Sequence, residues 1–198
     1  MPTLRLLSLT LSGSLDAAAA ARAVAEVRPD VVSVHGAPSL LRWRSRSAQF
    51  ARRCGLVVVG GGRTAGGNLL MSTLGVDVLG TSNLTFSGVR GPLAPGAAVA
   101  VLRRFGAGCT IAGARLGTPP DVRTDQLTQL RSAVADLVPD DLPAVLDLQG
   151  LDGDALTRLA QPLGLIVAAG GVLVDRRLTV VEATVTGHIV RVDLDLPT

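Results

Sequence analysis

The sequence contains no lysine and no tyrosine, and it has few aromatic side chains of any kind. All 19 of its basic residues are therefore arginines, set against 16 acidic ones, which leaves a net charge of only +3. So small an excess permits an anionic partner but does not require one. The aromatic residues are Trp43, Phe50, Phe86 and Phe105. So few rings argue against a surface that stacks on successive bases of a single strand.

Cysteine is also scarce, and long apolar runs are missing. Cys54 and Cys109 lie far apart in the sequence and form no Cys-x-x-Cys pair, which disfavours a zinc site and favours two buried free thiols. No stretch approaches the roughly 20 apolar residues that a membrane-spanning helix needs. The apolar run at 6–11 contains Ser8 and Thr10 and is too short for the core of a signal peptide. We therefore expect a cytoplasmic protein with no membrane partner.

The abundant residues are aliphatic and small. Hydrophobic residues make up 47% of the chain, which is enough to bury a sizeable aliphatic core. A length of 198 residues fits one domain, residues 1–198, better than two small ones. No internal repeat, linker or low-complexity segment divides the chain. We therefore expect a single domain.

Apolar periodicity predicts a chain that contains both strands and helices. Helices are expected at 17–27 with Asp16 as N-cap, at 40–54, at 123–137, and at 153–160 with Asp152 as N-cap. Strands are expected at 4–11, 31–34, 56–59, 68–72, 76–79, 83–86, 97–103, 109–115, 144–148, 165–168, 172–174, 178–185 and 188–196. Hairpins separated by glycine-rich turns are typical of antiparallel sheet. This order indicates the α/β (α+β) class: a four-layer α/β/β/α sandwich of two mostly antiparallel sheets with helices outside.

The predicted helix at 40–54 has two distinct faces. Trp43, Phe50 and Cys54 share one face, which is most simply packed against the core. The other face is polar and carries Arg42, Arg46, Gln49 and Arg53. It is either a solvated surface or, together with Arg63 and Arg115, an anion-binding surface for phosphate or nucleic acid, because guanidinium groups contact phosphate in a bidentate manner.

A glycine-rich run at 60–67 follows a predicted strand, which is where nucleotide-binding proteins place a phosphate loop. The residues after it argue against that role. No Gly-Lys-Ser/Thr closes the run, and 68–72 has the pattern of a strand rather than a helix. We interpret the run as a strand connection, with nucleotide binding as the alternative.

Five segments, in order along the chain, resemble the endonuclease/exonuclease/phosphatase superfamily, which includes pancreatic deoxyribonuclease, abasic-site endonucleases and inositol phosphatases. Residues 6–10 resemble the opening strand that ends in Trp-Asn, and 28–37 resemble Arg-Pro-Asp-Val-Val-x-x-Gln-Glu-Ala. Residues 112–117 resemble the Thr-His-Leu strand end, 143–149 the Asp-x-Asn strand, and 185–188 the final Ser-Asp-His. The resemblance implies a two-sheet sandwich and phosphoester hydrolysis, in which carboxylates hold Mg²⁺ while an aspartate and a histidine prepare the attacking water.

Several positions that carry this chemistry hold other residues here. By the resemblance, Thr10 stands at the metal-site asparagine and Gly36 at the metal-binding glutamate. Arg115 stands at the phosphate-stabilising histidine. Asp147 keeps the aspartate of the Asp-x-Asn strand, but Gln149 replaces its asparagine.

The C-terminal motifs are also altered. Gly187 replaces the late aspartate that orients the general base, and His188 alone keeps that base. The segment 169–171, Ala-Gly-Gly, stands where the family has Ile-Asp-His. The catalytic candidates are therefore Asp147, Gln149 and His188, and Asp147 is the candidate metal ligand.

These replacements predict a dismantled active site. Mg²⁺ needs anionic oxygen ligands held in place, and a histidine without a carboxylate to fix its tautomer is a poor base. We therefore expect a catalytically degenerate pseudoenzyme without a cofactor, acting as a binding or regulatory module for a protein partner or nucleic acid. The alternative is a residual Mg²⁺- or Mn²⁺-dependent phosphodiesterase or nuclease rebuilt around Asp147. Its further carboxylates would come from Asp152, Asp154, Asp193 and Asp195.

Overall fold

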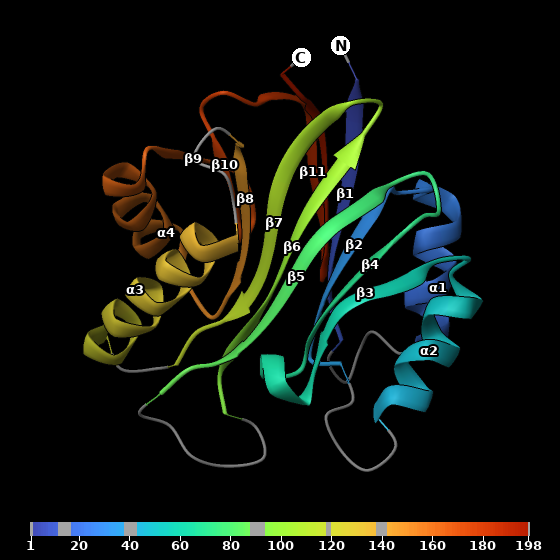
Figure 1. The fold of residues 1–198 in the computed structure, drawn as a ribbon, viewed down its shortest axis with the longest axis horizontal. Coiled ribbons are helices and arrows are strands. Elements are labelled where there is room, and N and C mark those ends of the chain that lie inside the picture. The colour runs from blue at the N-terminus through green and yellow to red at the C-terminus, as the bar shows by residue number, and fades with distance from the viewer. Residues whose placement is uncertain are drawn as a thin grey trace.

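Two six-stranded sheets pack face to face and carry helices on their outer sides (Figure 1). The computed structural model describes residues 2–11, 17–37, 43–87, 94–117, 120–137 and 142–197. These residues form the α/β/β/α sandwich that the sequence predicts.

The first sheet has the strand order β11 (Thr179–Thr186), β12 (Ile189–Asp195), β1 (Thr3–Thr10), β2 (Val31–His35), β4 (Asn68–Ser72) and β3 (Val57–Gly62). The second sheet has the order β5 (Asp77–Thr85), β6 (Gly96–Arg104), β7 (Ala107–Arg115), β8 (Ala144–Gln149), β10 (Val172–Asp175) and β9 (Leu165–Ala169). One pair in each sheet, β1–β2 and β7–β8, is parallel. The other neighbouring pairs are antiparallel, which confirms the prediction of mostly antiparallel sheets.

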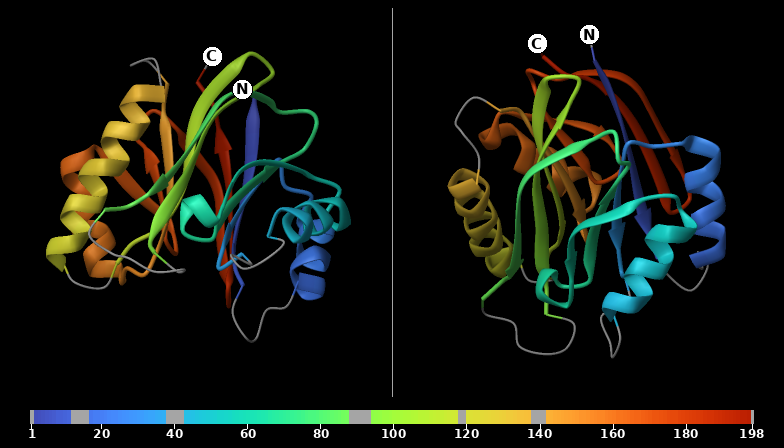
Figure 2. Two further views of the ribbon diagram at one scale, coloured as in Figure 1. Left: turned by 60° about the horizontal axis from the view of Figure 1, so that its bottom comes forward. Right: turned by 45° about the vertical axis from the view of Figure 1, so that its right-hand side comes forward.

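The four helices form the outer layers. Helices α1 (Ala17–Val27) and α2 (Trp43–Arg53) cover the first sheet, and α3 (Pro120–Leu137) and α4 (Gly153–Ala160) cover the second (Figures 1 and 2). Two short 3₁₀ turns, η1 (Arg63–Ala65) and η2 (Gln161–Leu163), follow β3 and α4. None of the helices in the described part of the chain is long and apolar enough to cross a membrane.

Three apolar layers hold the sandwich together, one between the sheets and one under each pair of helices. Neighbouring residues fall into different layers because successive side chains of a strand point to opposite faces. Leu6 and Val31, for example, lie between the sheets, whereas Leu7 and Val32 lie under α1 and α2. The strand β2 is therefore buried on both faces, as its run of apolar residues predicts.

Two stretches differ from the sequence-based expectation. The strands predicted at 76–79 and 83–86 are one strand, β5, whose register shifts at a bulge between Val78 and Gly80. The glycine run at 60–67 is partly strand, because β3 continues to Gly62 against β4. The alternation of apolar and polar residues predicted strand at both ends of β5. It did not predict that a bulge at Val78–Gly80 would let the strand continue between them.

The helix boundaries agree more closely with the prediction. The helix expected at 123–137 begins earlier, at Pro120. Proline suits the first helical turn because an N–H group there would have no acceptor within the helix, so its absence costs nothing. The expected cap of α4 is confirmed: Asp152 Oδ1 accepts a hydrogen bond from the Ala155 amide at 2.7 Å. Asp16, the expected cap of α1, lies outside the described residues.

The cap of α4 gives a first test of the fold. We expect Asp152→Ala to lower the free energy of unfolding by about 1 kcal/mol, because an amide of the first turn loses its acceptor. For a chain of this size the loss corresponds to a fall in Tm of about 2–4 °C, measurable by circular dichroism. Asp152→Asn keeps an oxygen acceptor and should remain close to wild type. An Asn variant as unstable as the Ala variant would contradict the capping role.

Candidate functional site

Four residues singled out from the sequence meet where β1, β2, β7 and β8 end, towards the bottom of Figure 1. They are Thr10, Gly36, Arg115 and Gln149. The topology brings them together, because β1–β2 and β7–β8 are parallel pairs and β2 packs against β7. The cavity between them has a volume of about 440 Å³ and is completed by Leu11, Leu116, Gly117 and Gly150.

Gly36 adopts a backbone conformation that leaves no room for a side chain. Its φ of +75° is in the left-handed region, and a Cβ atom added to it would lie 2.6 Å from the Leu11 carbonyl oxygen. The Leu11 segment is itself held in place, because its amide donates to the His35 carbonyl at 2.9 Å. A glutamate cannot replace Gly36 unless this junction shifts. The backbone at Gly36 is therefore not suited to the glutamate that the sequence resemblance places at this position.

A buried histidine that the sequence analysis did not single out lies behind the cavity. His35 Nε2 is 2.8 Å from Asp147 Oδ2, and both side chains are almost inaccessible to solvent. Its other ring nitrogen, Nδ1, is 2.7 Å from Asn68 Oδ1. Asn68 donates its Nδ2 hydrogens to the carbonyls of Ala65 and Gly96, so its Oδ1 acts as the acceptor. Both ring nitrogens of His35 therefore carry protons, and the ring forms an imidazolium–carboxylate pair with Asp147.

The pKa values of the pair follow from this arrangement. Burial alone disfavours the imidazolium, but the charge and hydrogen bonding of Asp147 outweigh it and raise the pKa of His35. Burial likewise disfavours the carboxylate, but the charge and hydrogen bonding of His35 lower the pKa of Asp147. The positive charge of Arg115 also acts on His35 and favours a lower pKa for its ring. The guanidinium at the cavity is thus close enough to affect the pair.

The residues at this site do not fit a magnesium ion. Asp147 is 2% exposed, and its carboxylate is held by His35 rather than directed into the cavity. The side chains that line the cavity are neutral, apart from the cationic Arg115. Within the described ranges, no group of three or more histidine, cysteine, aspartate or glutamate side chains is placed to hold a metal. Magnesium takes an octahedron of oxygen ligands that usually includes one or two carboxylates, and no carboxylate of the described residues lines this cavity.

The other catalytic candidates are less centrally placed. Gly187 and His188 form the turn between β11 and β12, and the His188 carbonyl accepts from the Thr10 amide at 3.0 Å. The backbone of His188 thus lies beside the end of β1, while the residue is exposed. Gln149 lines the cavity directly.

The additional aspartates of the alternative metal site are dispersed. Asp152 caps α4, and Asp154 is exposed on the first turn of that helix. Asp193 pairs with Arg5 and Arg191, and Asp195 accepts from the Thr3 hydroxyl at 2.9 Å. None of these four lines the cavity where β1 and β8 end.

The predicted arginine surface is not continuous. Arg115 lines the cavity described above, whereas Arg46 and Arg53 line a smaller cavity of about 240 Å³ beside α2. Arg63 is exposed in η1, and Arg42 lies outside the described residues. Of the arginines in the described part of the chain that were singled out, Arg115 alone lies at the junction of the two sheets.

The two free cysteines differ in exposure. Cys109 is buried, as expected, and burial raises the pKa of its thiol to about 12. Cys54 is only half-buried, and partial burial raises the pKa of its thiol to about 11. Both thiols are therefore protonated and unreactive near neutral pH.

Comparisons with known proteins identify the fold. No protein-family model and no curated protein sequence matches the chain. The endonuclease/exonuclease/phosphatase from Bacteroides vulgatus is 12% identical, with a TM-score of 0.79 over 100% of both chains. The human nocturnin catalytic domain, solved with a bound sulfate anion, is 12% identical, with a TM-score of 0.71 over 98% of this chain and 95% of that one. A mannosyl-6-phosphatase from Bacteroides thetaiotaomicron is 12% identical, with a TM-score of 0.68 over 98% of this chain and 100% of that one.

This chain therefore has the fold of the endonuclease/exonuclease/phosphatase proteins. The five sequence segments predicted that fold, and the superpositions confirm it over nearly the whole chain. Identities this low establish the fold alone, so the activity has to be argued from the site.

The His35–Asp147 pair predicts how stability depends on pH. The pKa of His35 is raised in the folded protein. Its contribution to the free energy of unfolding is therefore complete below its ordinary pKa of 6.5 and is lost as pH rises through its pKa in the folded protein. The pKa of Asp147 is lowered in the folded protein. Its contribution to the free energy of unfolding is therefore complete above its ordinary pKa of 3.8 and is lost as pH falls through its pKa in the folded protein. The pair should therefore stabilise the fold most between pH 3.8 and 6.5.

Urea unfolding between pH 4 and 9 measures this dependence. We expect His35→Gln to lower the free energy of unfolding by about 3–5 kcal/mol near pH 5, because it leaves a buried carboxylate without its cation. The difference from wild type should shrink at alkaline pH. His188→Gln removes the chain's other histidine, which is exposed, and serves as the control. Equal pH profiles for wild type and His35→Gln would contradict the ion pair.

The backbone at Gly36 can be tested against a second left-handed glycine. We expect Gly36→Ala to lower the free energy of unfolding by about 2–4 kcal/mol, through the left-handed strain and the collision with the Leu11 carbonyl. Gly55 has a similar φ of +68° with open space around its Cβ position, so Gly55→Ala should cost only the strain, about 1 kcal/mol. Chemical denaturation compares the two variants. Equal losses would show that the collision at Gly36 is relieved at no cost.

Proposed function

We propose that this chain is a degenerate member of the endonuclease/exonuclease/phosphatase superfamily whose former catalytic cavity binds a phosphate-bearing ligand without hydrolysing it. The observation that carries the proposal is the pairing of Asp147 with His35, which leaves Arg115 as the charged group that lines the cavity. The protein would then serve as a binding or regulatory module, and its partner would carry a phosphate group.

The charge of the site favours an anion. The His35–Asp147 pair is neutral as a whole, so the nearby guanidinium of Arg115 leaves an excess of one positive charge. A guanidinium presents its N–H groups in a planar fork that matches two oxygens of a phosphate. The nocturnin structure contains a sulfate, so a protein of this fold has been solved with a tetrahedral anion.

The same features disfavour hydrolysis. A metal-dependent phosphodiesterase needs carboxylates that hold the ion and a base that prepares water. Here the backbone at Gly36 excludes a glutamate, and the Asp147 carboxylate is committed to a buried partner. These two observations support the binding role over a metal site rebuilt around Asp147.

Binding can be located by the glycine amides that line the cavity. Titration of ¹⁵N-labelled protein with inorganic phosphate should shift the amide resonances of Gly117 and Gly150. Arg115→Gln should weaken this binding by about tenfold, because a charge-assisted contact is lost. Arg131→Gln on the exposed side of α3 changes the net charge equally and is the control. Unshifted glycine amides at saturating phosphate would refute the site.

Turnover is tested separately, with plasmid DNA, RNA and a chromogenic phosphodiester in Mg²⁺, Mn²⁺ or EDTA. We expect no metal-dependent hydrolysis, because the site lacks its ligands. Asp147→Ala runs alongside the wild type. Metal-dependent turnover that disappears in this variant would establish the alternative, a residual phosphodiesterase or nuclease with Mg²⁺ or Mn²⁺ at Asp147.

A further inference from the structure

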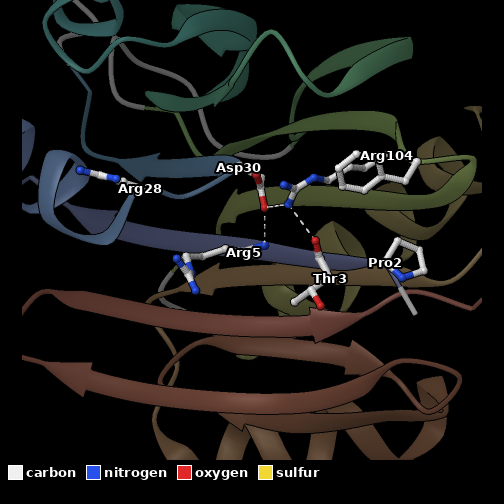
Figure 3. Close-up of a pocket in the computed structure, with 7 residues that line it drawn as sticks. Pro2, Thr3, Arg5, Arg28, Asp30 and Arg104 are labelled. Atoms are coloured by element: carbon white, nitrogen blue, oxygen red, sulfur yellow. Dashed lines mark hydrogen bonds and ion pairs between the residues drawn. The ribbon is translucent and has the colours of Figure 1, made fainter.

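A second and larger cavity lies where β1 begins (Figure 3). Thr10 lies at the other end of the same strand. The volume of this cavity is about 670 Å³, which is within the usual range of roughly 300–1,000 Å³ for small-molecule sites. Its walls come from the start of β1, the end of α1, the start of β2 and the turn between β6 and β7. The lining residues are Pro2, Thr3, Arg5, Arg28, Asp30, Arg104 and Phe105.

Three guanidinium groups border this cavity against one carboxylate. Asp30 accepts from the Arg5 amide at 2.8 Å and pairs with Arg104, which also donates to the Thr3 carbonyl at 2.7 Å (Figure 3). These contacts use one terminal nitrogen of Arg104. Among the described residues, neither its other terminal nitrogen nor the guanidinium of Arg28 has a hydrogen-bond or ion-pair partner.

The positive charge of the cavity exceeds what its partners offset. Arg5 pairs with Asp193 at 3.0 Å, and Asp193 also pairs with Arg191, which pairs in turn with Glu182. The excess charge is therefore the one guanidinium of Arg28. Burial, together with the charge of Arg5, lowers the pKa of Arg104, as expected where guanidinium groups gather. An anion in the cavity would relieve this repulsion.

Backbone strain is concentrated at the same place. Within the described ranges, Arg28 and Phe105 are the two non-glycine residues with positive φ, both at +50°, and both line this cavity. Arg28 follows the last residue of α1, where glycine or asparagine is usual. Phe105 opens a two-residue turn with Gly106, where asparagine or aspartate is usual. Strain of this kind tends to be retained where function requires it.

Phe105 is an aromatic ring in open solvent. The residue is 78% exposed, and the Arg104 guanidinium lies 4.9 Å from its ring centroid. The ring therefore gains little from burial in the protein. A planar aromatic ligand that stacks on it would remove apolar surface from water and retain the guanidinium contact.

We propose that this cavity binds a nucleotide, with the phosphate on the free terminal nitrogen of Arg104 and the base stacked on Phe105, while Arg28 adds positive charge on the other side of Asp30 (Figure 3). The position is distinct from the cavity at Arg115 and does not depend on the function proposed there. A phosphate without a base would satisfy the arginines but would leave Phe105 without a role.

Calorimetric titration of the full chain carrying Arg115→Gln, with AMP, ribose 5-phosphate and inorganic phosphate, tests the assignment. We expect AMP to bind about tenfold more tightly than ribose 5-phosphate, because the base adds a stacking contact. AMP should also shift the amide of Gly106 and leave that of Gly117 unchanged. Equal affinities for the three probes would reduce the site to a simple anion site and overturn the proposal, as would absence of AMP binding.

Two substitutions separate binding from folding. Phe105→Asn and Arg28→Asn each place a residue that tolerates the left-handed region, so we expect Tm to rise by about 2–4 °C. Phe105→Asn should nevertheless weaken AMP binding by about tenfold, through loss of the ring, and Arg28→Asn should weaken it less, through loss of a charge that lines the cavity. Arg131→Gln should change neither quantity. Variants that gain stability and bind AMP as tightly as the parent would overturn the proposal, and so would variants with unchanged Tm and unchanged binding.

Discussion

One buried ion pair, between His35 and Asp147, determines what this fold can do here. His35 ends β2 in the first sheet and Asp147 lies on β8 in the second, so the pair connects the two halves of the sandwich. Asn68 extends the connection to the backbone carbonyls of Ala65 and Gly96. Such a pair contributes little net stability compared with apolar residues, but removal of one partner costs about 3–5 kcal/mol. It therefore acts mainly as a constraint on how the sheets face each other.

That constraint decides the chemistry of the adjoining cavity. In a metal-dependent hydrolase the aspartate at this position would have to face water or an ion. Here the negative charge of Asp147 is neutralised by the buried imidazolium of His35. The left-handed backbone of Gly36 acts independently, because it excludes the side chain that would supply a second carboxylate. The ion pair and the Gly36 backbone therefore each disfavour a metal ion at this cavity. A carboxylate introduced at position 36 would still leave Asp147 paired with His35.

The sequence predicted the scaffold better than the site. The apolar run at 31–34, the cap at Asp152 and the strand at 68–72 were readable because burial and hydrogen bonding act locally on them. The meeting of Thr10, Gly36, Arg115 and Gln149 was implied only through the family resemblance, since the parts of the chain between them are long. Periodicity places residues on a face but does not tell which faces meet.

His35 was missed because its partner lies in a different sheet. A signal was present, since a polar residue that ends a wholly apolar strand needs a buried partner, and Asp147 occupies the same kind of position. Nothing in the spacing shows that these two residues face each other. The positive φ of Arg28 could not be read either, because it depends on how the chain leaves α1 to enter β2. Sequence patterns reflect average residue preferences. A buried ion pair between sheets and an arginine with positive φ are both exceptions to those preferences.

The strained turns at Arg28 and Phe105 are therefore the part of the molecule that folding explains least. Left-handed strain costs roughly 1–2 kcal/mol at each position, in a domain whose total stability is on the order of 5–15 kcal/mol. Packing does not offset this cost, because both residues are exposed. Asparagine or glycine would fit either position without strain. What the two residues share is the cavity that they line, where the proposed nucleotide would stack on Phe105 and be attracted by the charge of Arg28. The end of the sandwich at Thr10 holds a neutral ion pair, whereas the opposite end carries the guanidinium of Arg28, unpaired among the described residues, and both left-handed residues, which is the arrangement that the proposed nucleotide site requires.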